Sequence, residues 1–364
     1  MSIHSRTIDK HQSFFYQEKL DFRSVNPKRK IERIWCTTFS LVYLPIHLLK
    51  GIHGWIGRCI LRTAIAKYSK KIDLETMKTE LASEKIWGKL TQYKIQIDEA
   101  EINAFTLEHN QPTEGRWLLV SNGLGGCAIN RLQDSTDLAK TFHANMLVFD
   151  YPGTGDSTGL PKRSTLVKTY QTALNVLQTQ LQAKQLILYG HSFGGGVQAE
   201  ALHNYTFPKN FPVVAIKSRT FSSMTAATRW MVQLSSAEYL SMFKLHHAAK
   251  AISALLGRIT QVFILLIGWN IKTAEASRNL GIPEIILYSA SSEKNTPVND
   301  GVIPAAGTLA QGLGKSKKKS EKILIPVCEA HNDVLSFESL QILADKVHSL
   351  LSTSAASLPP LTPN

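Results

Sequence analysis

The chain has 364 residues, which is enough for one large α/β domain with additions or for two modest domains. Apolar residues make up 43% of it, as in a globular protein with a substantial core rather than a disordered chain. Lysine and arginine outnumber aspartate and glutamate by 41 to 28, so the net charge is +13. This charge favours an acidic partner, either an anionic membrane surface or a nucleic acid. No zinc-finger, RRM, KH or helix-turn-helix pattern occurs, and a nucleic-acid partner is therefore disfavoured.

The leader, residues 1–30, is polar and lacks the apolar stretch of a signal peptide, so we expect it to be poorly ordered. The chain has four cysteines, and none of them forms a C-x-x-C pair. Their spread predicts reduced thiols in a reducing compartment, either the cytoplasm or the membrane periphery, and leaves export by another route open. The cysteines are Cys36, Cys59, Cys127 and Cys328.

An apolar segment follows at residues 34–60. Its stretch from Ile34 to Leu49 holds no charged residue apart from His47, and basic residues flank it on both sides. This stretch is 16 residues long and contains Pro45, so it is shorter than the roughly 20 residues of a membrane-spanning helix and would be kinked. We expect residues 1–91 to hold either an interfacial membrane anchor or a pair of helices docked on the core. A transmembrane span fits less well.

Predicted strands and helices alternate over residues 92–351. Short apolar runs predict the strands, and an apolar face at helical spacing predicts a helix over Thr165–Leu181. Such alternation is typical of a mainly parallel sheet flanked by helices and connected by right-handed crossovers. The predicted strands are Tyr93–Ile97, Ile102–Leu107, Trp117–Val120, Met146–Phe149, Gln185–Tyr189, Val213–Ile216, Glu284–Tyr288 and Ile323–Val327.

Three further segments are predicted from the second half of the chain. Residues 224–283 are too many for a simple crossover, and we interpret them as a helical cap or lid inserted over one edge of the sheet. The lysine-rich segment Lys315–Lys322 is expected to be an exposed loop. A closing helix is expected over Phe337–Leu351, followed by a disordered tail at residues 352–364.

One motif marks the end of the predicted strand Gln185–Tyr189. The sequence Gly190-His191-Ser192-Phe193-Gly194 places a serine between two glycines, with a helix-compatible segment after it. This is the G-x-S-x-G pattern of a nucleophile elbow, whose tight turn leaves no room for side chains at Gly190 and Gly194. The motif predicts Ser192 as an acyl-accepting nucleophile, next to the free N–H groups of a helix start. An ordinary glycine-rich turn is the alternative.

A serine hydroxyl needs a base to take its proton and a third group to orient that base. His331 follows the last predicted strand and precedes the closing helix, which is where the base belongs. Asp300 and Glu293 both follow the strand Glu284–Tyr288 and are candidates for the third group. Asp300 is favoured because an acid followed by two residues and then Ile-Pro is a frequent pattern for the third group after this strand. Glu293 is nearer the end of the strand.

The loop Asn122-Gly123-Leu124-Gly125 follows the strand Trp117–Val120. Its Leu124 N–H and the N–H of Phe193 are predicted to form an oxyanion hole. The same loop has an alternative interpretation as a dinucleotide-binding fingerprint, with Asp150 as the acid for a ribose. That alternative explains neither the elbow nor the histidine. No P-loop lysine and no Cys/His cluster with metal spacing occurs, so no cofactor and no metal are expected.

Taken together, residues 93–351 resemble the α/β-hydrolase superfamily. The segments that carry the resemblance are the elbow, the turn Asp150–Ser157, Asp300–Pro304 and His331–Asp333. The turn and the His-Asn-Asp sequence are similar to the branch that contains membrane-associated protein depalmitoylases. The segment Arg219–Ser223 is similar to that branch and to the chlamydial 43-kDa hydrolase-like family, which has an apolar N-terminal region. The chain departs from the superfamily in having Asn-Gly where His-Gly is frequent, and in a longer segment before Asp300.

The resemblance implies an α/β-hydrolase that cleaves an acyl ester or thioester without a cofactor. It implies Ser192 as nucleophile, His331 as base and Asp300 as the acid that orients the base. The apolar N-terminal region, the positive charge and the apolar insertion favour a lipid-like or lipidated substrate and an anionic membrane surface as a partner. Two alternatives use the same fold: acyl transfer to an acceptor other than water, and a non-catalytic, membrane-docked binding protein.

Overall fold

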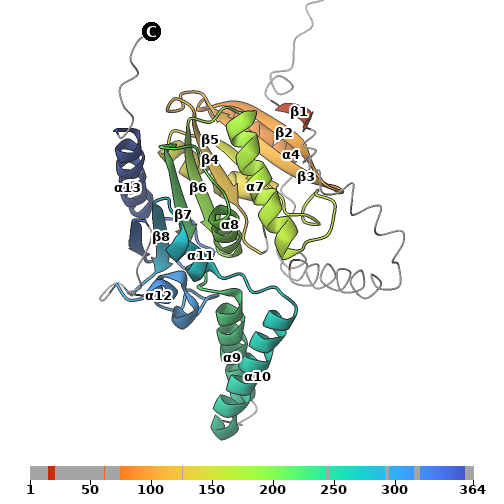
Figure 1. Cartoon of the computed structure of the whole chain (residues 1–364), viewed down its shortest axis with the longest axis vertical. Helices are drawn as coiled ribbons and strands as arrows, with labels where there is room; N and C mark the ends of the chain where they lie inside the picture. Colours follow the sequence, from red (N-terminus) through yellow and green to blue (C-terminus); the bar gives the residue numbers. More distant parts are fainter. Residues whose placement is uncertain are drawn as a thin grey trace, which may run out of the picture.

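The computed structural model describes residues 15–20, 61, 74–124, 126–242, 246–291, 295–314 and 320–356. Within these residues a 9-stranded sheet has the order β1-β2-β3-β5-β4-β6-β7-β8-β9 (Figure 1). The strands are β1 (Phe15–Leu20), β2 (Trp87–Ile97), β3 (Ala100–His109), β4 (Arg116–Ser121), β5 (Asn145–Phe149), β6 (Gln185–His191), β7 (Val213–Ser218), β8 (Glu284–Ser289) and β9 (Lys322–Val327).

The sheet is mainly parallel, as the alternation of strands and helices predicts. Strand β4 runs parallel to β5 and β6, and the run from β6 to β9 is parallel throughout. Only β3 is antiparallel to its neighbours, β2 and β5, while β1 runs parallel to β2. Parallel pairing brings the carboxyl ends of β6, β7, β8 and β9 to one edge of the sheet, which is the edge where open α/β sheets bind ligands.

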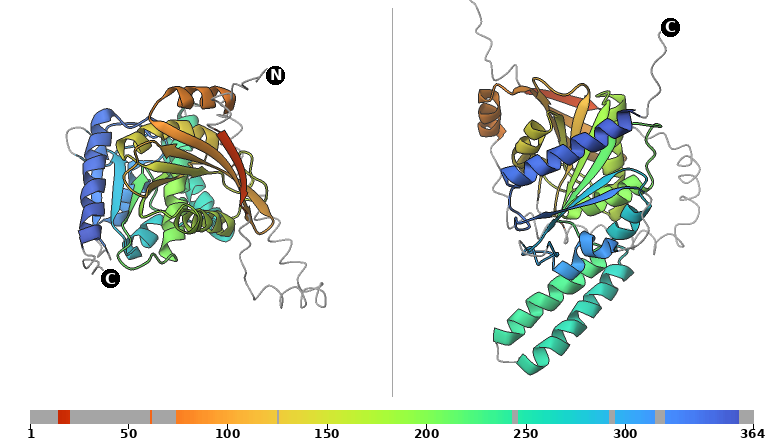
Figure 2. Two further views of the ribbon diagram at one scale, coloured as in Figure 1. Left: turned by 90° about the horizontal axis from the view of Figure 1, so that it is seen from above. Right: turned by 90° about the vertical axis from the view of Figure 1, so that its left-hand side faces the viewer.

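Helices cover both faces of the sheet (Figure 2). One face is covered by α7 (Arg163–Thr179), α8 (Phe193–His203), α11 (Thr273–Asn279) and α12 (Leu309–Leu313), with the short η1 (Ala305–Gly307) before α12. The other face is covered by α4 (Leu74–Ser83), α5 (Ala128–Asp134), α6 (Thr136–Thr141) and α13 (Phe337–Ala356).

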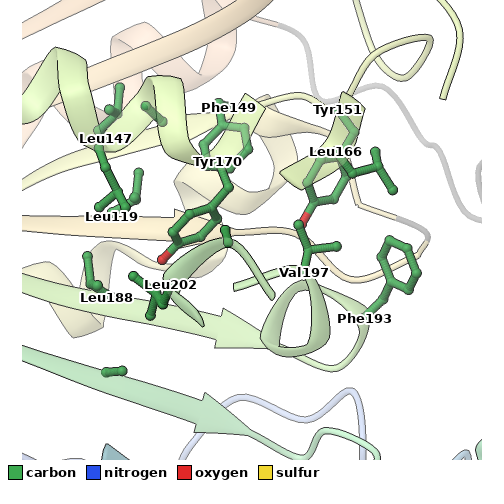
Figure 3. Packing of buried hydrophobic residues seen from close by; sticks show 14 of the residues in the cluster. Leu119, Leu147, Phe149, Tyr151, Leu166, Tyr170, Leu188, Phe193, Val197 and Leu202 are labelled. Carbon is green, nitrogen blue, oxygen red and sulfur yellow. The ribbon is translucent and has the colours of Figure 1, made fainter. Parts of the chain in front are cut away.

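Side chains of the central strands alternate between two cores, one on each face. Leu119 of β4 packs in the same core as Tyr170 of α7, whereas Leu118 packs in the core that includes Leu343 of α13. Figure 3 shows the core of Leu119 and Tyr170. Because both faces are covered, the central strands are apolar throughout and not alternately polar, which explains the short apolar runs in the sequence.

Some element ends differ from the sequence predictions. Phe15–Leu20, expected within a poorly ordered leader, forms strand β1 and pairs along the outer edge of β2, whose backbone groups it satisfies. Strand β2 begins at Trp87, ahead of residue 92, and α4 places Met77 and Leu81 in the core. Helix α13 continues to Ala356, within the expected tail. The apolar segment 34–60, with both its anchor and docked-helix interpretations, lies outside the described residues.

The expected lid corresponds to a helical hairpin. Helices α9 (Met224–Met242) and α10 (His246–Leu266) pack against each other and project away from the sheet (Figure 1, Figure 2). Helix α11, which was included in the expected insertion, packs instead against α8. The hairpin leaves after β7 and returns before α11, so it starts beside the carboxyl edge of the sheet rather than lying over it.

A charged cluster is fully buried between β7, β8 and β9. Lys217 and Lys322 both pair with the carboxylate of Glu284, and the Lys322 Nζ–Glu284 Oε2 distance is 2.7 Å. Lys322 was expected in the exposed basic loop, but its ammonium lies inside and donates to the Ser320 hydroxyl at 2.7 Å. Burial and the nearby Lys322 charge lower the pKa of Lys217 well below its usual value. One carboxylate therefore balances two lysines in a region without solvent.

Removing the charge of Glu284 is expected to destabilise the protein strongly. Glu284→Gln removes the carboxylate that the two buried lysines share and leaves the buried ammonium of Lys322 without a counter-charge. Breaking a buried pair in this way costs about 3–5 kcal/mol. The measurement is the free energy of unfolding in urea, followed by circular dichroism. The matched control is Glu275→Gln, which removes an exposed partner of Lys272 and should cost less than about 1 kcal/mol. Equal losses in the two variants would contradict the role given to the buried cluster.

Candidate active site

Ser192 stands at the turn between β6 and α8. Its backbone has φ +51° and ψ −118°, a conformation that non-glycine residues rarely adopt. Three hydrogen bonds hold it there: the Ser192 N–H donates to Ser218 O at 2.9 Å, and Ser192 O accepts from the Gly195 N–H at 3.1 Å and from the Thr220 hydroxyl at 2.5 Å. The turn places the serine side chain at the carboxyl edge of the sheet, as a nucleophile elbow requires.

The two elbow positions, 190 and 194, have no room for a side chain, so both must be glycine. A Cβ at Gly190 would lie 2.7 Å from Gly195 Cα, and a Cβ at Gly194 would lie 2.4 Å from Ser121 O. Both distances are far inside van der Waals contact, and both neighbours are backbone atoms that cannot move aside. The alternative of an ordinary glycine-rich turn does not explain the serine between them in this backbone conformation.

The structure brings Ser192, His331 and Asp300 together. His331 Nε2 lies 2.8 Å from Ser192 Oγ, and His331 Nδ1 lies 2.7 Å from Asp300 Oδ2. His331 follows β9 and Asp300 follows β8, so both reach the carboxyl edge where β6 places Ser192. The side chains of His331 and Asp300 are buried, at 4% and 2% exposure, which strengthens the electrostatic interaction between them.

The Asp300 carboxylate is fixed by its own loop. Its second oxygen, Oδ1, accepts the backbone N–H groups of Val302 at 3.0 Å and of Ile303 at 2.6 Å. The Asp300 carbonyl accepts the His331 N–H at 2.8 Å, so the two residues are joined through the backbone as well as the side chains. Glu293, the other candidate acid, lies outside the described residues.

Arg219 fastens the loop that carries His331, and its role was not predicted from the sequence. Its guanidinium is buried and donates to the carbonyls of Ala330 and Asp333, the latter at 2.9 Å. Its backbone has φ +48°, and its N–H donates to Leu287 O at 2.8 Å. Arg219 thereby joins the ends of β7 and β8 to the residues on either side of His331. An arginine directly after a buried strand is the only sequence signal that points to this role.

His191 adds an aromatic ring beside the base without adding charge. Its ring centroid lies 5.1 Å from that of His331. Burial, followed by the interactions with Arg131, His331 and Arg219, lowers the pKa of His191 well below its usual value. His191 is therefore neutral at neutral pH, and it does not oppose a positive charge on His331.

The two expected oxyanion donors lie next to Ser192. Phe193 is the first residue of α8, so its N–H has no acceptor inside the helix. A Cβ at Gly123 would lie 3.6 Å from Ser192 Cβ, which places the peptide that leads to Leu124 against the nucleophile. Leu124 also lines the cavity that Ser192 faces. The next residue, Gly125, lies outside the described residues.

The side chain of Tyr151 contacts both segments that carry the two expected donors. Tyr151 packs edge-on against Phe193, with ring centroids 6.1 Å apart, and its hydroxyl donates to Asn122 O at 3.3 Å. Figure 3 shows Tyr151 and Phe193 among the buried side chains of one core. The Asn122 amide donates to Phe149 O at 2.9 Å, which fixes the start of the same loop. The backbone of both expected donors therefore rests on one rigid cluster.

A cavity of about 620 Å³ opens beside Ser192. It is bounded by Ser192 and His331 on one side and by α5, α6, α9 and α13 on the others. Its apolar lining comes from Leu124, Leu138, Met231, Val302, Leu335 and Leu340. A cavity of this volume holds a small molecule or a short acyl chain.

Asp150, which would bind the ribose in the dinucleotide alternative, is fully engaged in hydrogen bonds within the protein. It is 1% exposed, and Oδ1 accepts the N–H of Ala128 at the start of α5 at 2.6 Å. Oδ2 accepts from the Asn103 amide at 3.1 Å and from the Asp156 N–H at 3.4 Å. A ribose hydroxyl has no access to this carboxylate, so the geometry does not support the dinucleotide alternative. No cluster of His, Cys, Asp or Glu that could hold a metal occurs among the described residues.

The stability of the protein is expected to depend on the ionisation of Asp150. Burial raises the pKa of Asp150 from 3.8 to about 6, against the opposing hydrogen bonds from Ala128, Asn103 and Asp156. Because the folded pKa is above the unfolded one, the folded state binds the proton more tightly, and Asp150 favours folding more as the pH falls through 6. The free energy of unfolding of the wild type, relative to Asp150→Asn, should rise by about 1.4 kcal/mol between pH 7 and pH 5. A difference that stays constant over this range would contradict the raised pKa.

Solved structures of other proteins share this architecture. The α/β-hydrolase (ABH) from Vibrio vulnificus is 14% identical and has a TM-score of 0.54, with 83% of this chain and 93% of that chain covered. An esterase, Pf2001, from Pyrococcus furiosus is 9% identical over 73% of this chain and 90% of its own, with a TM-score of 0.49. A proline iminopeptidase from Mycobacterium smegmatis is 13% identical over 72% and 99%, with a TM-score of 0.49. The sheet order and the likeness to the Vibrio protein define an α/β-hydrolase fold.

The chain belongs to the family described as Chlamydia CHLPS protein (DUF818), whose sequence profile matches residues 44–244 and 244–352. These two matches cover Ser192, Asp300 and His331. No curated protein matches the chain at a significant level.

Proposed function

We propose that the protein is a serine hydrolase that cleaves an acyl ester or thioester. The observation that carries the proposal is the chain of two short contacts from Ser192 through His331 to Asp300, at 2.8 and 2.7 Å. The serine lies in the strained backbone conformation of a nucleophile elbow, and a cavity adjoins it. A non-catalytic binding protein has no need for the combination of these three features.

The reaction follows from the positions of these groups. His331 Nε2 takes the proton of Ser192 Oγ as the oxygen attacks the acyl carbon, and Asp300 stabilises the positive charge that forms on His331. The oxyanion accepts hydrogen bonds from the Leu124 and Phe193 N–H groups. His331 then returns the proton to the leaving alcohol or thiol as the carbon–oxygen or carbon–sulfur bond breaks. Water, deprotonated by His331, attacks the acyl-enzyme and releases the carboxylic acid and free Ser192.

The acyl group is proposed to be lipid-like. Part of the cavity lining is apolar, and Met231 of the projecting hairpin contributes to that part. A chain of methylene groups gains about 0.8 kcal/mol for each CH₂ transferred from water to such surroundings, so affinity for the substrate should rise with acyl length. We further propose that the protein acts in a reducing compartment or at a membrane surface, in keeping with the free thiols of Cys127 and Cys328.

Covalent labelling tests the proposal. A fluorophosphonate probe should label the wild type, should fail to label Ser192→Ala, and should label His331→Ala far more slowly. Ser349→Ala is the matched control, because Ser349 is an exposed serine of α13 remote from the elbow. A set of p-nitrophenyl esters and matching thioesters of increasing acyl length then defines the substrate class. If the folded wild type shows no labelling that depends on Ser192, the proposal of a serine hydrolase is refuted.

A further inference from the structure

The hairpin of α9 and α10 is packed on one side only. Ala249, Ser253, Gly257 and Ile264 form the buried side of α10. The contact with α9 is close, since a Cβ at Gly257 would lie 2.7 Å from the backbone oxygen of Arg229. Small residues therefore let the two helices approach, and this side of α10 is accounted for by the fold.

The opposite side of α10 is an exposed apolar stripe. Its seven side chains recur at i, i+3, i+4, i+7, i+10, i+11 and i+14, so they share one helix face. Their exposed fractions run from 39% for Ile252 to 80% for Leu266. The stripe is about 21 Å long at 1.5 Å per residue. It consists of Ile252, Leu255, Leu256, Ile259, Val262, Phe263 and Leu266.

Such a surface is uncommon on a protein that meets only water. Isolated exposed apolar side chains are ordinary, but a continuous stripe on a projecting element indicates an interaction surface. The described part of the chain offers nothing to cover it, because the hairpin extends away from the sheet (Figure 1, Figure 2). The occupant must therefore come from outside these residues.

The charges on α10 favour an anionic lipid surface. The helix carries Lys250 and Arg258 and no aspartate or glutamate, and the whole chain has a net charge of +13. The α10 helix of a second copy would offer no acidic side chain to either of these charges. A bilayer with anionic headgroups offers an apolar interior for the stripe and negative charge for Lys250 and Arg258.

The helix suits the membrane surface better than a crossing. The window Ala249–Leu266 has a mean hydropathy of 1.5, and among the described helices it is the one with the length and composition to span a bilayer. However, one side of it is packed on α9, which carries the exposed Glu238. A helix with one apolar and one packed side lies in the plane of the interface, with its apolar side about 5–10 Å deep.

We propose that α10 docks the protein on anionic membranes through this stripe. The docking is independent of the proposed hydrolase activity. If the protein both docks on membranes and is a hydrolase, Met231 connects the docking hairpin with the site, because it belongs to α9 and lines the cavity beside Ser192. A docked hairpin would then hold the mouth of that cavity at the lipid surface.

Vesicle binding tests the docking surface. The full-length chain carrying Ser192→Ala is mixed with phosphatidylcholine vesicles that contain or lack phosphatidylserine, and the bound fraction is measured by flotation. The variant Leu255→Gln, Ile259→Gln, Phe263→Gln should bind vesicles at least about ten-fold more weakly. The control replaces three exposed apolar residues elsewhere, Leu324, Phe337 and Ile342, with glutamine and should bind normally. Lys250→Gln with Arg258→Gln should weaken only the binding that depends on phosphatidylserine.

Each other outcome overturns the proposal. Unchanged binding of the α10 variant would show that another part of the chain docks. A Ser192→Ala protein that is dimeric by light scattering, with a monomeric α10 variant that still binds vesicles, would show that the stripe holds a second copy. Circular dichroism of each variant excludes misfolding. Because every protein in the experiment carries Ser192→Ala, failure of the docking proposal says nothing about the hydrolase proposal.

Discussion

Replacing Ser192 with alanine is expected to lower kcat/KM for a short acyl ester by about 10⁴-fold or more. Among the described residues, Ser192 Oγ is the hydroxyl that contacts His331 Nε2, and the proposed acyl-enzyme cannot form without it. His331→Ala should cost a similar factor, because an unassisted serine is a poor nucleophile. The measurement is initial rates of p-nitrophenyl ester hydrolysis over a range of substrate concentrations.

The double variant separates a triad from two independent contributions. Residues that act as one unit are not additive, so Ser192→Ala with His331→Ala should lose about as much activity as either change alone. Ser349→Ala and His348→Ala serve as controls, since both side chains are exposed on α13. Losses that multiply in the double variant would show that the two residues do not act together.

Asp300→Asn is expected to lower kcat by about 10⁴-fold near neutral pH. The asparagine oxygen can still accept the N–H groups of Val302 and Ile303, so the loop keeps its shape. Its amide nitrogen would then donate to His331 Nδ1 and leave the proton on Nε2. In that tautomer His331 cannot accept the proton of Ser192, although the geometry is nearly unchanged.

The control for this change is Asp333→Asn, which makes the same substitution in the loop of His331. The Asp333 carboxylate accepts the backbone N–H of Ala330 at 3.1 Å, and an asparagine oxygen can do the same. A loss below about ten-fold is expected there. Glu293→Gln is compared with both, because Glu293 is the other carboxylate after β8. A larger loss from Glu293→Gln than from Asp300→Asn would reassign the acid.

The central sheet could be predicted because its signals are local. Each buried strand is a short apolar run, and the turns after β4 and β6 carry glycines that the backbone needs. The serine, the acid and the histidine could be placed because each follows such a run, and parallel strands end at a common edge. The sequence favoured Asp300 over Glu293 on its Ile-Pro pattern, and the contact between Asp300 and His331 is known only from the structure. Glu293 lies outside the described residues.

Other features depend on contacts between distant residues and leave little local signal. Arg219 is bonded to carbonyls more than 100 residues away, at separations of 111 and 114. Lys322 belongs to a lysine-rich segment, and only Glu284 on the neighbouring strand explains its burial. The α10 stripe is apolar like a core helix, and its exposure follows from the direction in which the hairpin leaves the sheet.

The order of the strands has a consequence for the newly made chain. Ser192 and His331 are separated by 139 residues. His331 follows β9, so the ribosome adds it after β9 has been made. At about 5–20 residues per second, a ribosome needs roughly 7–28 s to travel from the serine codon to the histidine codon. During that interval the nascent chain holds Ser192 but not yet His331, its proposed base. The proposed hydrolase is therefore expected to be inactive in a nascent chain that does not yet hold His331.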